Sequence, residues 1–320
     1  MADLRLTLGC CDHDRTRALL DGRVGVPGCL IDPTPIPPEE LFPRVVAEAP
    51  FDISEMSFSS YLVQIARGEG DYAAIPVFVS RAFRHGGIYV RDGAGIDVPK
   101  DLEGRLVGVP EYQMTMALWV RGILQDEYGV DFRKIKYRTG GANTPGRRER
   151  LPLDLPVGMD VAPVPEGRSL NDMLVSGELD AVFAPSPIDA FTSGNQAIRR
   201  LFADPEAEGR AYYAKTGMFP IMHVIGIRRS LVDGHPGLAR NLFRAFAGAR
   251  NLAVRDIEKS APASANRPPL PWPYGVAENR KELDVAVRYS HEQYLCARRL
   301  SVEELFVPET LDLADDPRIP

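Results

Sequence analysis

The sequence predicts an α/β protein of two lobes with a helical C-terminal region, and three observations support this fold class. Short apolar strands alternate with amphipathic helices along the first part of the chain. A glycine-rich polar stretch, residues 91–104, is a natural crossing between lobes. A long apolar strand, residues 219–229, then returns to the first lobe. We therefore expect a first lobe of residues 1–93 and 225–320, a second lobe of residues 94–224, and a ligand cleft between them.

The first lobe alternates strands and helices in chain order. Its strands are short apolar or β-branched runs that end in polar or proline-rich turns. They are expected at Leu4–Gly9, Cys29–Ile31, Phe51–Ile53, Tyr72–Val79 and Gly87–Val90. Helices follow turns that carry acidic residues, prolines or serines, which favour helix starts. Helices are expected at Arg15–Leu20, at Glu39–Ala47 and from the serine-rich stretch that contains Ser57, Ser59 and Ser60.

The second lobe continues the same alternation, and helices then dominate the C-terminal region. A strand at Leu106–Val109 stops at Pro110, and an apolar helix follows. Further strands are expected at Ile135–Arg138, Leu179–Phe183 and Arg199–Phe202, with a helix at Ser169–Ser176 and a long irregular segment between residues 139 and 167. Later helices are expected at Pro236–Ile257, Val276–Tyr289, His291–Arg298 and Val302–Leu305, with a proline-rich loop over residues 260–275.

Length, composition and charge exclude several classes of function. The 320 residues can form two medium-sized cores, and 44% hydrophobic and 26% charged residues are ordinary for a soluble protein. A net charge of -6 argues against nucleic acid as the main partner, because phosphate binding needs a basic surface. No apolar run approaches the roughly 20 residues of a membrane span, so no membrane partner is expected. The charged N-terminus is not a signal peptide, which indicates a cytoplasmic protein.

The four cysteines show no CxxC spacing, so neither a zinc site nor a disulfide framework is indicated. Cys10 and Cys11 at the end of the first strand are expected to be a reduced, buried pair. No activating partner for a nucleophilic thiol can be identified from the spacing. Neither a GxGxxG nor a GxxxxGK[ST] motif occurs, so nucleotide binding has no support. Exposed apolar positions in the proline-rich loops indicate self-association into a homo-oligomer of undefined size.

The strand-to-helix turns are the expected ligand sites, because unpaired N–H groups of helix starts gather at the carboxyl ends of strands. The turn Glu111–Thr115 suits a small anion, and a plain helix cap is the alternative. Ser57, Ser59 and Ser60 crowd another helix start, although capping needs only one of them. Asp14 has two interpretations, an N-cap or a site residue, and so does His223, as a core or a catalytic histidine. Asp189 is expected within reach of the cleft, after a possible cap at Ser186.

The loop SRAFRH places Arg81, Arg84 and His85 within five positions. A guanidinium matches the geometry of a carboxylate, so this cluster predicts a clamp for an acidic ligand. A solvated loop with surface ion pairs is the alternative. The GRRER run at residues 146–150 is expected to be a solvated face or an oligomer contact.

The order of strand–helix units, crossing and return strand resembles that of type II periplasmic binding proteins, which bind a ligand between two lobes. Five segments, in order over most of the chain, carry a closer likeness: EMSFSSYL, IPVFVSRAFRHGGIYV, LVGVPEYQMTMALWVRGIL, WPYGVAENRKEL and EELF. Through these segments the chain resembles, within that superfamily, the 4,5-dihydroxyphthalate decarboxylase family. This resemblance implies loss of CO₂ from a hydroxylated aromatic acid, with 4,5-dihydroxyphthalate giving protocatechuate.

Decarboxylation of a phenolic acid needs a base for the hydroxyl, an acid for the ring carbon, and a firm hold on the carboxylate that stays. We assign His85 as the first choice for proton donor, followed by His13 and His223, with Glu111 or Asp14 as orienting or accepting carboxylate. Replacing His85 by Ala is expected to reduce turnover at least roughly a hundredfold. The residues assigned to substrate binding are Arg81, Arg84, Arg121, Ser57, Ser59, Ser60, Tyr112, Gln113, Thr115, Asp189, Trp272 and Tyr274.

No organic cofactor is expected, because the ring itself accepts the electrons. A divalent metal held by His13, Asp12, Asp14, His85 and Glu111 is an alternative, although no HxH or HExxH spacing supports it. Two other functions stay open. The fold favours a non-catalytic solute receptor or sensor for an aromatic acid, and the scaffold also suits a different lyase or a tautomerase.

Overall fold

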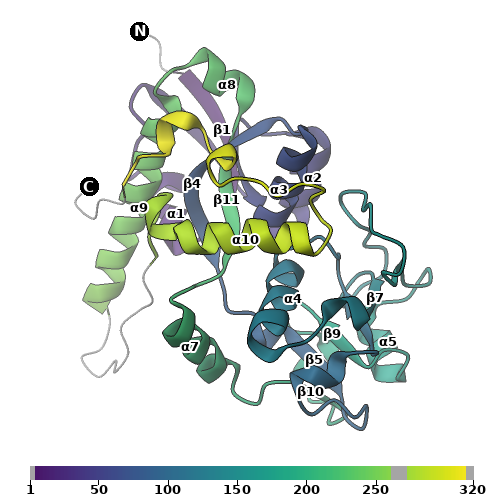
Figure 1. Cartoon of the computed structure of the whole chain (residues 1–320). Coiled ribbons are helices and arrows are strands. Elements are labelled where there is room, and N and C mark those ends of the chain that lie inside the picture. The colour runs from purple at the N-terminus through teal and green to yellow at the C-terminus, as the bar shows by residue number, and fades with distance from the viewer. Residues whose placement is uncertain (1–3, 261–271, 315–320) are drawn as a thin grey trace. The chain divides into compact units, whose positions relative to one another are not determined.

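The computed structural model describes residues 4–260 and 272–314, and these residues form two compact units (Figure 1). Of the described residues, unit 1 contains 4–81, 221–260, 272–287 and 300–314, and unit 2 contains 82–220 and 288–299. The proline-rich loop predicted at residues 260–275 lies largely outside the described residues. Within the described part of the chain, no helix combines the length and hydropathy needed to cross a membrane.

Unit 1 is built on a five-stranded sheet of order β2-β1-β3-β11-β4. β1, β2 and β3 run parallel, and β11 lies antiparallel between β3 and β4. The strands are β1 (Leu4–Cys10), β2 (Cys29–Pro35), β3 (Ile53–Ser57), β4 (Tyr72–Arg81) and β11 (Ile221–Arg228). The carboxyl ends of β1 and β3 and the first residues of β11 therefore meet at one edge of the sheet. This is the edge where an open α/β sheet places its ligands.

Helices cover both faces of this sheet. Helices α1 (Asp14–Leu20) and α9 (Leu238–Ser260) pack together on one side, and α2 (Pro38–Glu48) and α3 (Phe58–Arg67) lie on the other (Figure 1). The core on the α1 and α9 side contains alternate residues of each strand, such as Leu6 and Leu8 of β1 with Phe243 and Phe246 of α9. Helix α8 (Arg229–Gly234) and the short turns η4 (Ala277–Asn279), η5 (Glu303–Leu305) and η6 (Pro308–Thr310) complete the unit.

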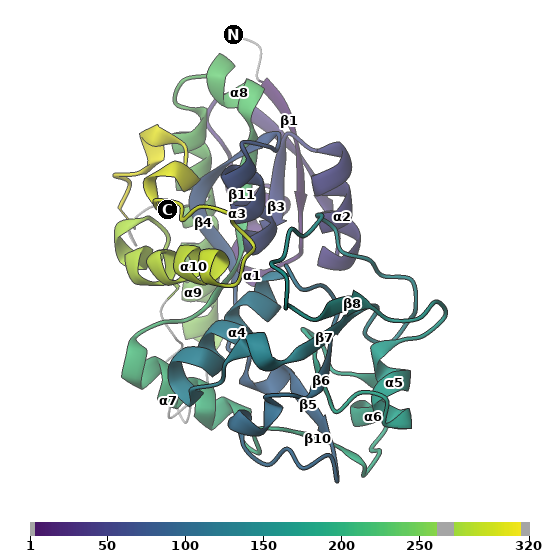
Figure 2. The same cartoon turned by 45° about the vertical axis from the view of Figure 1, so that its right-hand side comes forward.

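Unit 2 is built on a six-stranded sheet of order β10-β5-β9-β6-β7-β8 (Figure 2). Its strands are β5 (Ile88–Arg91), β6 (Leu106–Val109), β7 (Lys136–Thr139), β8 (Val161–Pro163), β9 (Ala181–Phe183) and β10 (Ile198–Arg200). Its helices are α4 (Thr115–Tyr128), α5 (Leu170–Ser176), α6 (Asp189–Thr192) and α7 (Pro205–Thr216), with turns η1 (His85–Gly87), η2 (Pro99–Leu102) and η3 (Phe132–Lys134). The sheet and the buried helix α4 place the turn Glu111–Met114 at the carboxyl end of β6.

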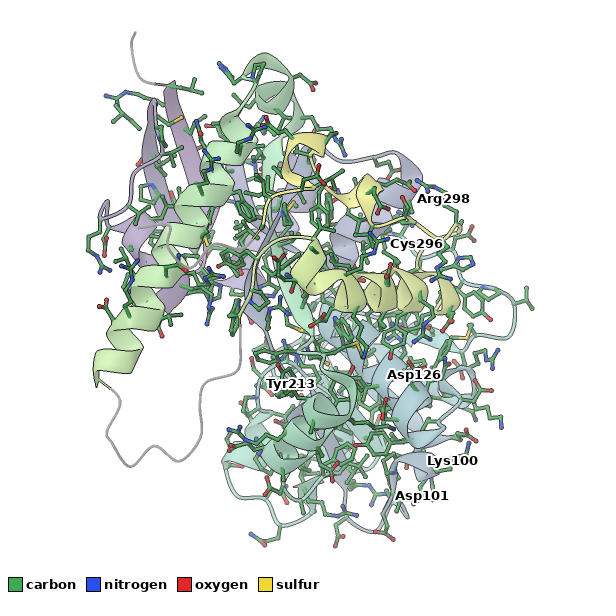
Figure 3. The ribbon with its side chains drawn as sticks, turned by 60° about the vertical axis from the view of Figure 1, so that its left-hand side comes forward. Lys100, Asp101, Asp126, Tyr213, Cys296 and Arg298 are labelled. Carbon is green, nitrogen blue, oxygen red and sulfur yellow. The ribbon has the colours of Figure 1, made fainter. Side chains whose placement is uncertain are left out.

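The long helix α10 (Arg280–Glu292) begins in unit 1, and its last turn belongs to unit 2. In unit 2, Arg288 forms an ion pair with Asp126 of α4 at 2.5 Å, and the Tyr289 hydroxyl donates to the same carboxylate at 2.7 Å. Figure 3 labels Asp126 on α4 and Cys296 in the segment after α10. The C-terminal region therefore contributes to both units.

Several expectations differ from the structure. The first lobe was expected to extend to residue 93, but β5 pairs with β9 and β10 of the second sheet, so the division falls after Arg81. The predicted helix His291–Arg298 is wrong: Tyr294 has a positive φ of 64°, which no helix continues, and turns follow α10. The third strand was expected at Phe51–Ile53 but covers Ile53–Ser57, and all five of its residues, polar ones included, are buried.

Among the strands and α-helices of the described residues, β8, α6, α7 and α8 were not predicted. The helices Glu39–Ala47 and Ser169–Ser176 and most strands were predicted within a few residues of their observed bounds. Val157, in the long irregular segment of unit 2, is fully exposed. The homo-oligomer stays a prediction.

Candidate active site

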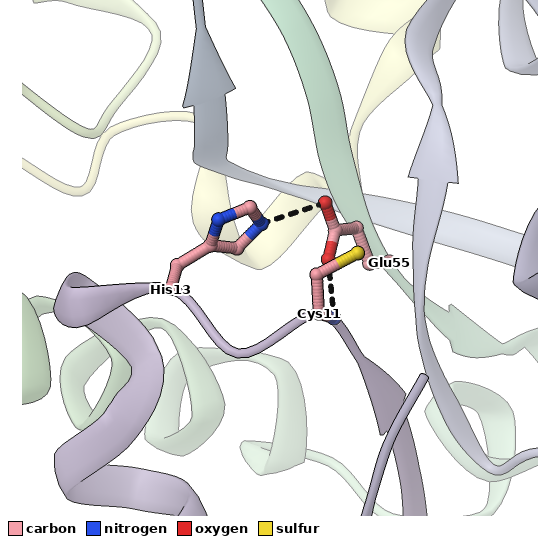
Figure 4. A group of neighbouring side chains, drawn as sticks. All are labelled: Cys11, His13 and Glu55. Carbon is pink, nitrogen blue, oxygen red and sulfur yellow. Dashed lines mark hydrogen bonds and ion pairs between the residues drawn. The ribbon is translucent and has the colours of Figure 1, made fainter. Parts of the chain in front are cut away.

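Glu55, in the middle of β3, is a fully buried carboxylate that accepts hydrogen bonds at both oxygens. Oε1 lies 2.9 Å from Nε2 of His13 and 2.6 Å from Nδ1 of His223. Oε2 accepts from the backbone N–H of Cys11 at 2.8 Å and from the thiol of Cys10 at 3.3 Å. Figure 4 shows the carboxylate between Cys11 and the ring of His13. We call Cys10, Cys11, His13, Glu55 and His223 the Glu55 cluster.

The strands place these residues together at one edge of the sheet. β1 ends at Cys10, and His13 follows in the turn before α1. β11 brings His223 beside β3, where His223 pairs with Ser57 and Ile225 pairs with Glu55. The β11–β4 pairing is irregular on both sides of His223, and a bulge of this kind re-aims a side chain. The ring of His223 consequently reaches Glu55 and also contacts Phe42 of α2 edge-on at 4.7 Å.

Glu55 is ionised in this environment. Burial alone would raise its pKa, but the hydrogen bonds and charges of His13 and His223 outweigh burial and hold the pKa well below its usual value. An ionised carboxylate is an acceptor only, so both rings must donate an N–H to it. This fixes the tautomer of both neutral rings. The side chains of His13 and His223 are 19% and 15% exposed, so both are partly accessible to a small molecule.

The two thiols beside Glu55 are protonated. Burial and the negative charge of Glu55 raise the pKa of Cys10 and of Cys11. Both cysteines are free and buried, which confirms the expected reduced pair. A protonated thiol is a poor nucleophile, so the contacts here give no support for nucleophilic chemistry at either cysteine.

Arg15 of α1 provides a partly buried cation in the same unit. Its guanidinium donates to the carbonyl oxygen of Val79 at 2.7 Å and stacks on the ring of Trp272 at 3.7 Å. The Trp272 indole N–H donates to the carbonyl oxygen of Phe78 at 2.6 Å, which fixes the ring. Burial lowers the pKa of Arg15, and the charges of Tyr274, Asp14 and Glu55 oppose this shift. This arrangement suits a flat, negatively charged ligand.

The three arginines predicted to bind substrate carboxylates have different surroundings. Arg81 is buried and contacts Asn279, the carbonyl oxygen of Pro273 and the carboxylate of Glu282. Arg121 is also buried, donates to Gln293 and to the Tyr112 carbonyl at 2.8 Å each, and stacks on the Tyr112 ring. For these two the chain itself supplies partners, which gives each a structural role.

Arg84 differs from the other two predicted arginines. It donates to the carbonyl oxygen of Pro185 at 3.4 Å, a long hydrogen bond. Burial lowers the pKa of Arg84 to about 10. A role in carboxylate binding stays a prediction for this residue.

His85 belongs to unit 2 and lies in an aromatic cage. Its ring is 5.2 Å from that of Phe202, 5.9 Å from that of Tyr212 and 6.3 Å from that of Tyr128. The residue is 2% exposed, and within the described residues neither ring nitrogen has a hydrogen-bond partner. Burial lowers the pKa of His85, which favours the neutral ring. Its assignment as proton donor stays a prediction, and its surroundings favour a packing role.

The turn predicted to bind an anion in unit 2 contains a second charged cluster. Glu111 is buried and accepts from Arg147 and Arg150 at 2.6 Å each and from the Gln113 side-chain amide at 2.6 Å. Glu149 accepts from the backbone N–H groups of Tyr112 and Gln113. Burial raises the pKa of Glu149 to about 7. The GRRER run is therefore bound to the turn, contrary to the expectation of a solvated face, and its own carboxylate occupies the turn's amide groups.

The remaining predicted residues lie as follows. Ser57 is the residue before α3, and Ser59 and Ser60 are buried in its first turn. Thr115 begins α4 and is buried, as are Tyr112, Gln113 and Tyr274. Asp14 is exposed and pairs with Arg17, which also binds Asp12, and Asp189 is exposed at the start of α6. Asp12 and Asp14 thus do not join His13 in a metal-ligand set.

Sequence reasoning missed Glu55, Arg15 and Glu149. The available signal for Glu55 was weak: a charged residue among two serines, with Ile53 and Met56 nearby, and a buried carboxylate requires donors around it. No signal in the sequence distinguishes Arg15 from the other surface-like arginines of α1. Glu149 could not be found, because its contacts depend on the path of a long irregular segment.

Known proteins resemble this chain in sequence and in fold. No protein-family model matches it. The chain is 38% identical over 328 residues to the 4,5-dihydroxyphthalate decarboxylase of Comamonas testosteroni, a match that covers 98% of this chain and 99% of that protein. It is 41% identical over 215 residues to the 4,5-dihydroxyphthalate decarboxylase of Pseudomonas putida, covering 67% of this chain and 83% of that protein.

Solved structures show the fold class. The periplasmic aliphatic sulphonate binding protein SsuA of Escherichia coli superposes with a TM-score of 0.56 at 14% identity, covering 95% of this chain and 97% of that one. The desulfurization enzyme DSZB, in complex with biphenyl-2-sulfinic acid, superposes with a TM-score of 0.53 at 16% identity, covering 98% of each chain. The predicted fold of periplasmic binding proteins is thereby confirmed. By sequence identity and coverage, the chain belongs to the 4,5-dihydroxyphthalate decarboxylase family of carboxy-lyases.

Proposed function

We propose that this protein decarboxylates a hydroxylated aromatic acid, with 4,5-dihydroxyphthalate as the first substrate to test, and that His13 and His223, held by Glu55, carry out the proton transfers. Membership of the family supports the reaction class. The observation that supports the site is one ionised, buried carboxylate shared by two partly exposed histidines at the ligand-binding edge of a sheet. Histidine suits both proton transfers because its charge changes near neutral pH.

The chemistry needs a base for the ring hydroxyl, an acid for the ring carbon and no external electron acceptor. A base removes the proton of the ring hydroxyl para to the departing carboxylate, and the electron pair moves into the ring. An acid then protonates the ring carbon that bears the carboxylate. The carbon–carbon bond breaks, CO₂ leaves, and its electron pair restores the aromatic ring. The phenolate regains its proton, so one proton from solvent is consumed in each turnover.

His13 and His223 meet the requirements for the base and the acid. Each ring donates one N–H to Glu55 and is partly exposed, so a ligand can reach it. When either ring gains a proton, the adjacent carboxylate balances the new positive charge. Because both rings contact the same Oε1, a charge on one disfavours a second charge on the other. One ring can therefore act as the base while the other acts as the acid.

The carboxylate that stays on the ring needs a cation, while the departing one does not, because a firm ion pair would stabilise it in the ground state. Arg15 is our first choice for this cation, since its guanidinium is half-buried beside Trp272 in the same unit as Glu55. The indole ring would then contact the aromatic ring of the substrate. Arg84 is the second choice, on the basis of its partly buried position and its long hydrogen bond.

Incubation of the protein with 4,5-dihydroxyphthalate tests this function directly. We expect release of one CO₂ for each substrate consumed and formation of protocatechuate, with activity retained after exhaustive chelation. A protein that binds the acid tightly but releases no CO₂ would instead be a receptor, the function that the likeness in fold to SsuA favours. A panel of hydroxybenzoates in the same assay identifies a related substrate if 4,5-dihydroxyphthalate is inert.

A further inference from the structure

The Glu55 cluster contains a set of metal-ligating atoms that the proposed reaction does not use together. Among the residues that the structure describes, the Sγ of Cys11, a ring nitrogen of His13 and a carboxylate oxygen of Glu55 lie within 4.8 Å of one another. Figure 4 shows the three side chains converging on one point from the end of β1 and from β3. The thiol of Cys11 has no role in the proton transfers above, so its position needs a separate explanation.

The chemical nature of these atoms selects a borderline-soft divalent cation. Thiolate and imidazole ligands favour zinc over magnesium or calcium, which prefer oxygen. Ligand atoms around a tetrahedral Zn²⁺ lie roughly 3.3–3.8 Å apart, given Zn–S and Zn–N distances of about 2.3 and 2.0 Å. A shift of about 1 Å in the side chains would therefore bring the three atoms to that spacing. Three protein ligands leave a fourth position open.

The charges in the cluster also suit a dication. The negative charge of Glu55 and burial disfavour the free thiolate of Cys11, since both raise the pKa of that thiol. A bound cation reverses this effect because it attracts both anions. Ionised Glu55 and the Cys11 thiolate together carry two negative charges, which neutralise Zn²⁺.

We propose that the Glu55 cluster binds one Zn²⁺ through Cys11, His13 and Glu55. On binding, the thiol proton leaves to solvent and the ring proton of His13 moves from Nε2 to Nδ1, so that Nε2 can bind the metal. No electron is transferred. The metal then binds the Nε2 lone pair of His13 and the carboxylate of Glu55, and the proton transfers need both of these groups. Zinc therefore inhibits the decarboxylation, a consequence that rests on the proposed function, whereas the binding itself does not.

Isothermal titration of chelator-treated protein with zinc chloride tests the site. We expect one Zn²⁺ per chain, and an affinity at least tenfold weaker in Cys11→Ser, which keeps the backbone N–H that binds Glu55. The control Cys29→Ser removes a thiol from β2, outside the cluster, and keeps the wild-type affinity. Titration in buffers of different ionisation enthalpy should show that zinc binding releases one more proton from the wild type than from Cys11→Ser.

The absorption spectrum of the protein titrated with cobalt chloride gives a second measurement of the site. A thiolate-to-cobalt charge-transfer band in the near ultraviolet is expected in the wild type and absent from Cys11→Ser. Equal zinc affinity of the wild type and Cys11→Ser, or a cobalt complex without that band, would overturn the proposal. In the activity assay, zinc should inhibit the wild type, a chelator should restore it, and Cys11→Ser should resist. If the protein is inactive on every acid tested, the titrations still decide the metal site.

Discussion

Replacing Glu55 by Gln is the perturbation that tests the acid–base cluster most sharply, because it keeps the size of the side chain and removes its charge. In the wild type, Oε1 accepts from both histidine rings, and Oε2 accepts from the Cys11 N–H and the Cys10 thiol. In Gln, one of these two positions becomes an NH₂ group. In either orientation of the amide, its NH₂ group faces at least one of the N–H or S–H groups that donate to Glu55 in the wild type.

The size of the effect follows from the two orientations. With the NH₂ group toward the rings, both histidines lose their acceptor and their tautomers change. The comparable carboxylate-to-amide change in the serine-protease triad costs roughly 10⁴-fold in turnover. With the NH₂ group toward Cys11, the rings keep a neutral acceptor and lose the balancing charge. We therefore expect a kcat reduced by roughly 10²–10⁴-fold, or about 3–5 kcal/mol in the activation barrier.

Release of CO₂ from 4,5-dihydroxyphthalate measures this effect, with the exposed Glu48→Gln as matched control. Glu55 is a positioning residue, so KM should change far less than kcat. The same variant should also change how the free energy of unfolding depends on pH. Because the pKa of Glu55 lies well below its ordinary 4.5, its ionised form stabilises the fold above that pH, and the contribution disappears as pH falls through the lowered pKa. The variant should therefore lose most stability, relative to the wild type, near neutral pH.

A folded Glu55→Gln variant with kcat within tenfold of the wild type would refute the reasoning. A difference in the free energy of unfolding that stays constant from neutral to acidic pH would contradict the ionised state of Glu55 in the fold.

Three further predictions concern residues outside the Glu55 cluster. The effect of Glu149→Gln on stability should be more favourable at pH 8 than at pH 5 by about 2–3 kcal/mol, because ionisation of the wild-type carboxylate costs stability as pH rises from 4.5 through about 7. Urea titrations at pH 5 and pH 8 check this, and an equal effect at both would contradict it. Arg15→Gln should raise KM at least tenfold with a smaller change in kcat; an unchanged KM would exclude a role in substrate binding. Arg84→Ala should raise KM in the same assay only if this arginine also binds a carboxylate, so an unchanged KM would count against the clamp predicted for it.

The fold was largely predictable because it depends on local pattern. Alternating apolar runs and helix starts locate most elements, and their order indicates two α/β units. The division between the units was misplaced because β5 pairs with strands more than ninety positions further along the chain, at residues 181–183 and 198–200. Pairing over that distance leaves no trace in a short window of sequence. The segment after α10 was misread as a helix because the left-handed conformation of Tyr294 is unusual for a residue other than glycine.

The candidate site was only partly predictable. His13 and His223 were identified as titratable residues at strand ends, but the carboxylate between them was not. Glu55 lies inside a strand whose neighbours are also polar, and that pattern is typical of a helix start. The buried Glu55 carboxylate is stable only because hydrogen-bond donors at the ends of β1 and β11 lie beside it. The pairing of the strands, and not the local sequence, brings these donors together. His85, by contrast, was chosen for its neighbours in sequence, whereas its neighbours in space are aromatic rings.

The turnover number of single-histidine variants, measured with the same hydroxylated aromatic acid, tests the central claim most directly. We predict that His13→Ala and His223→Ala each lose at least roughly a hundredfold in kcat. His85→Leu, which preserves an apolar side chain in its aromatic cage, should keep kcat within about tenfold of the wild type, a smaller change than loss of a general acid or base produces. Near-normal turnover in both cluster variants, together with loss of turnover in His85→Leu, would contradict the account.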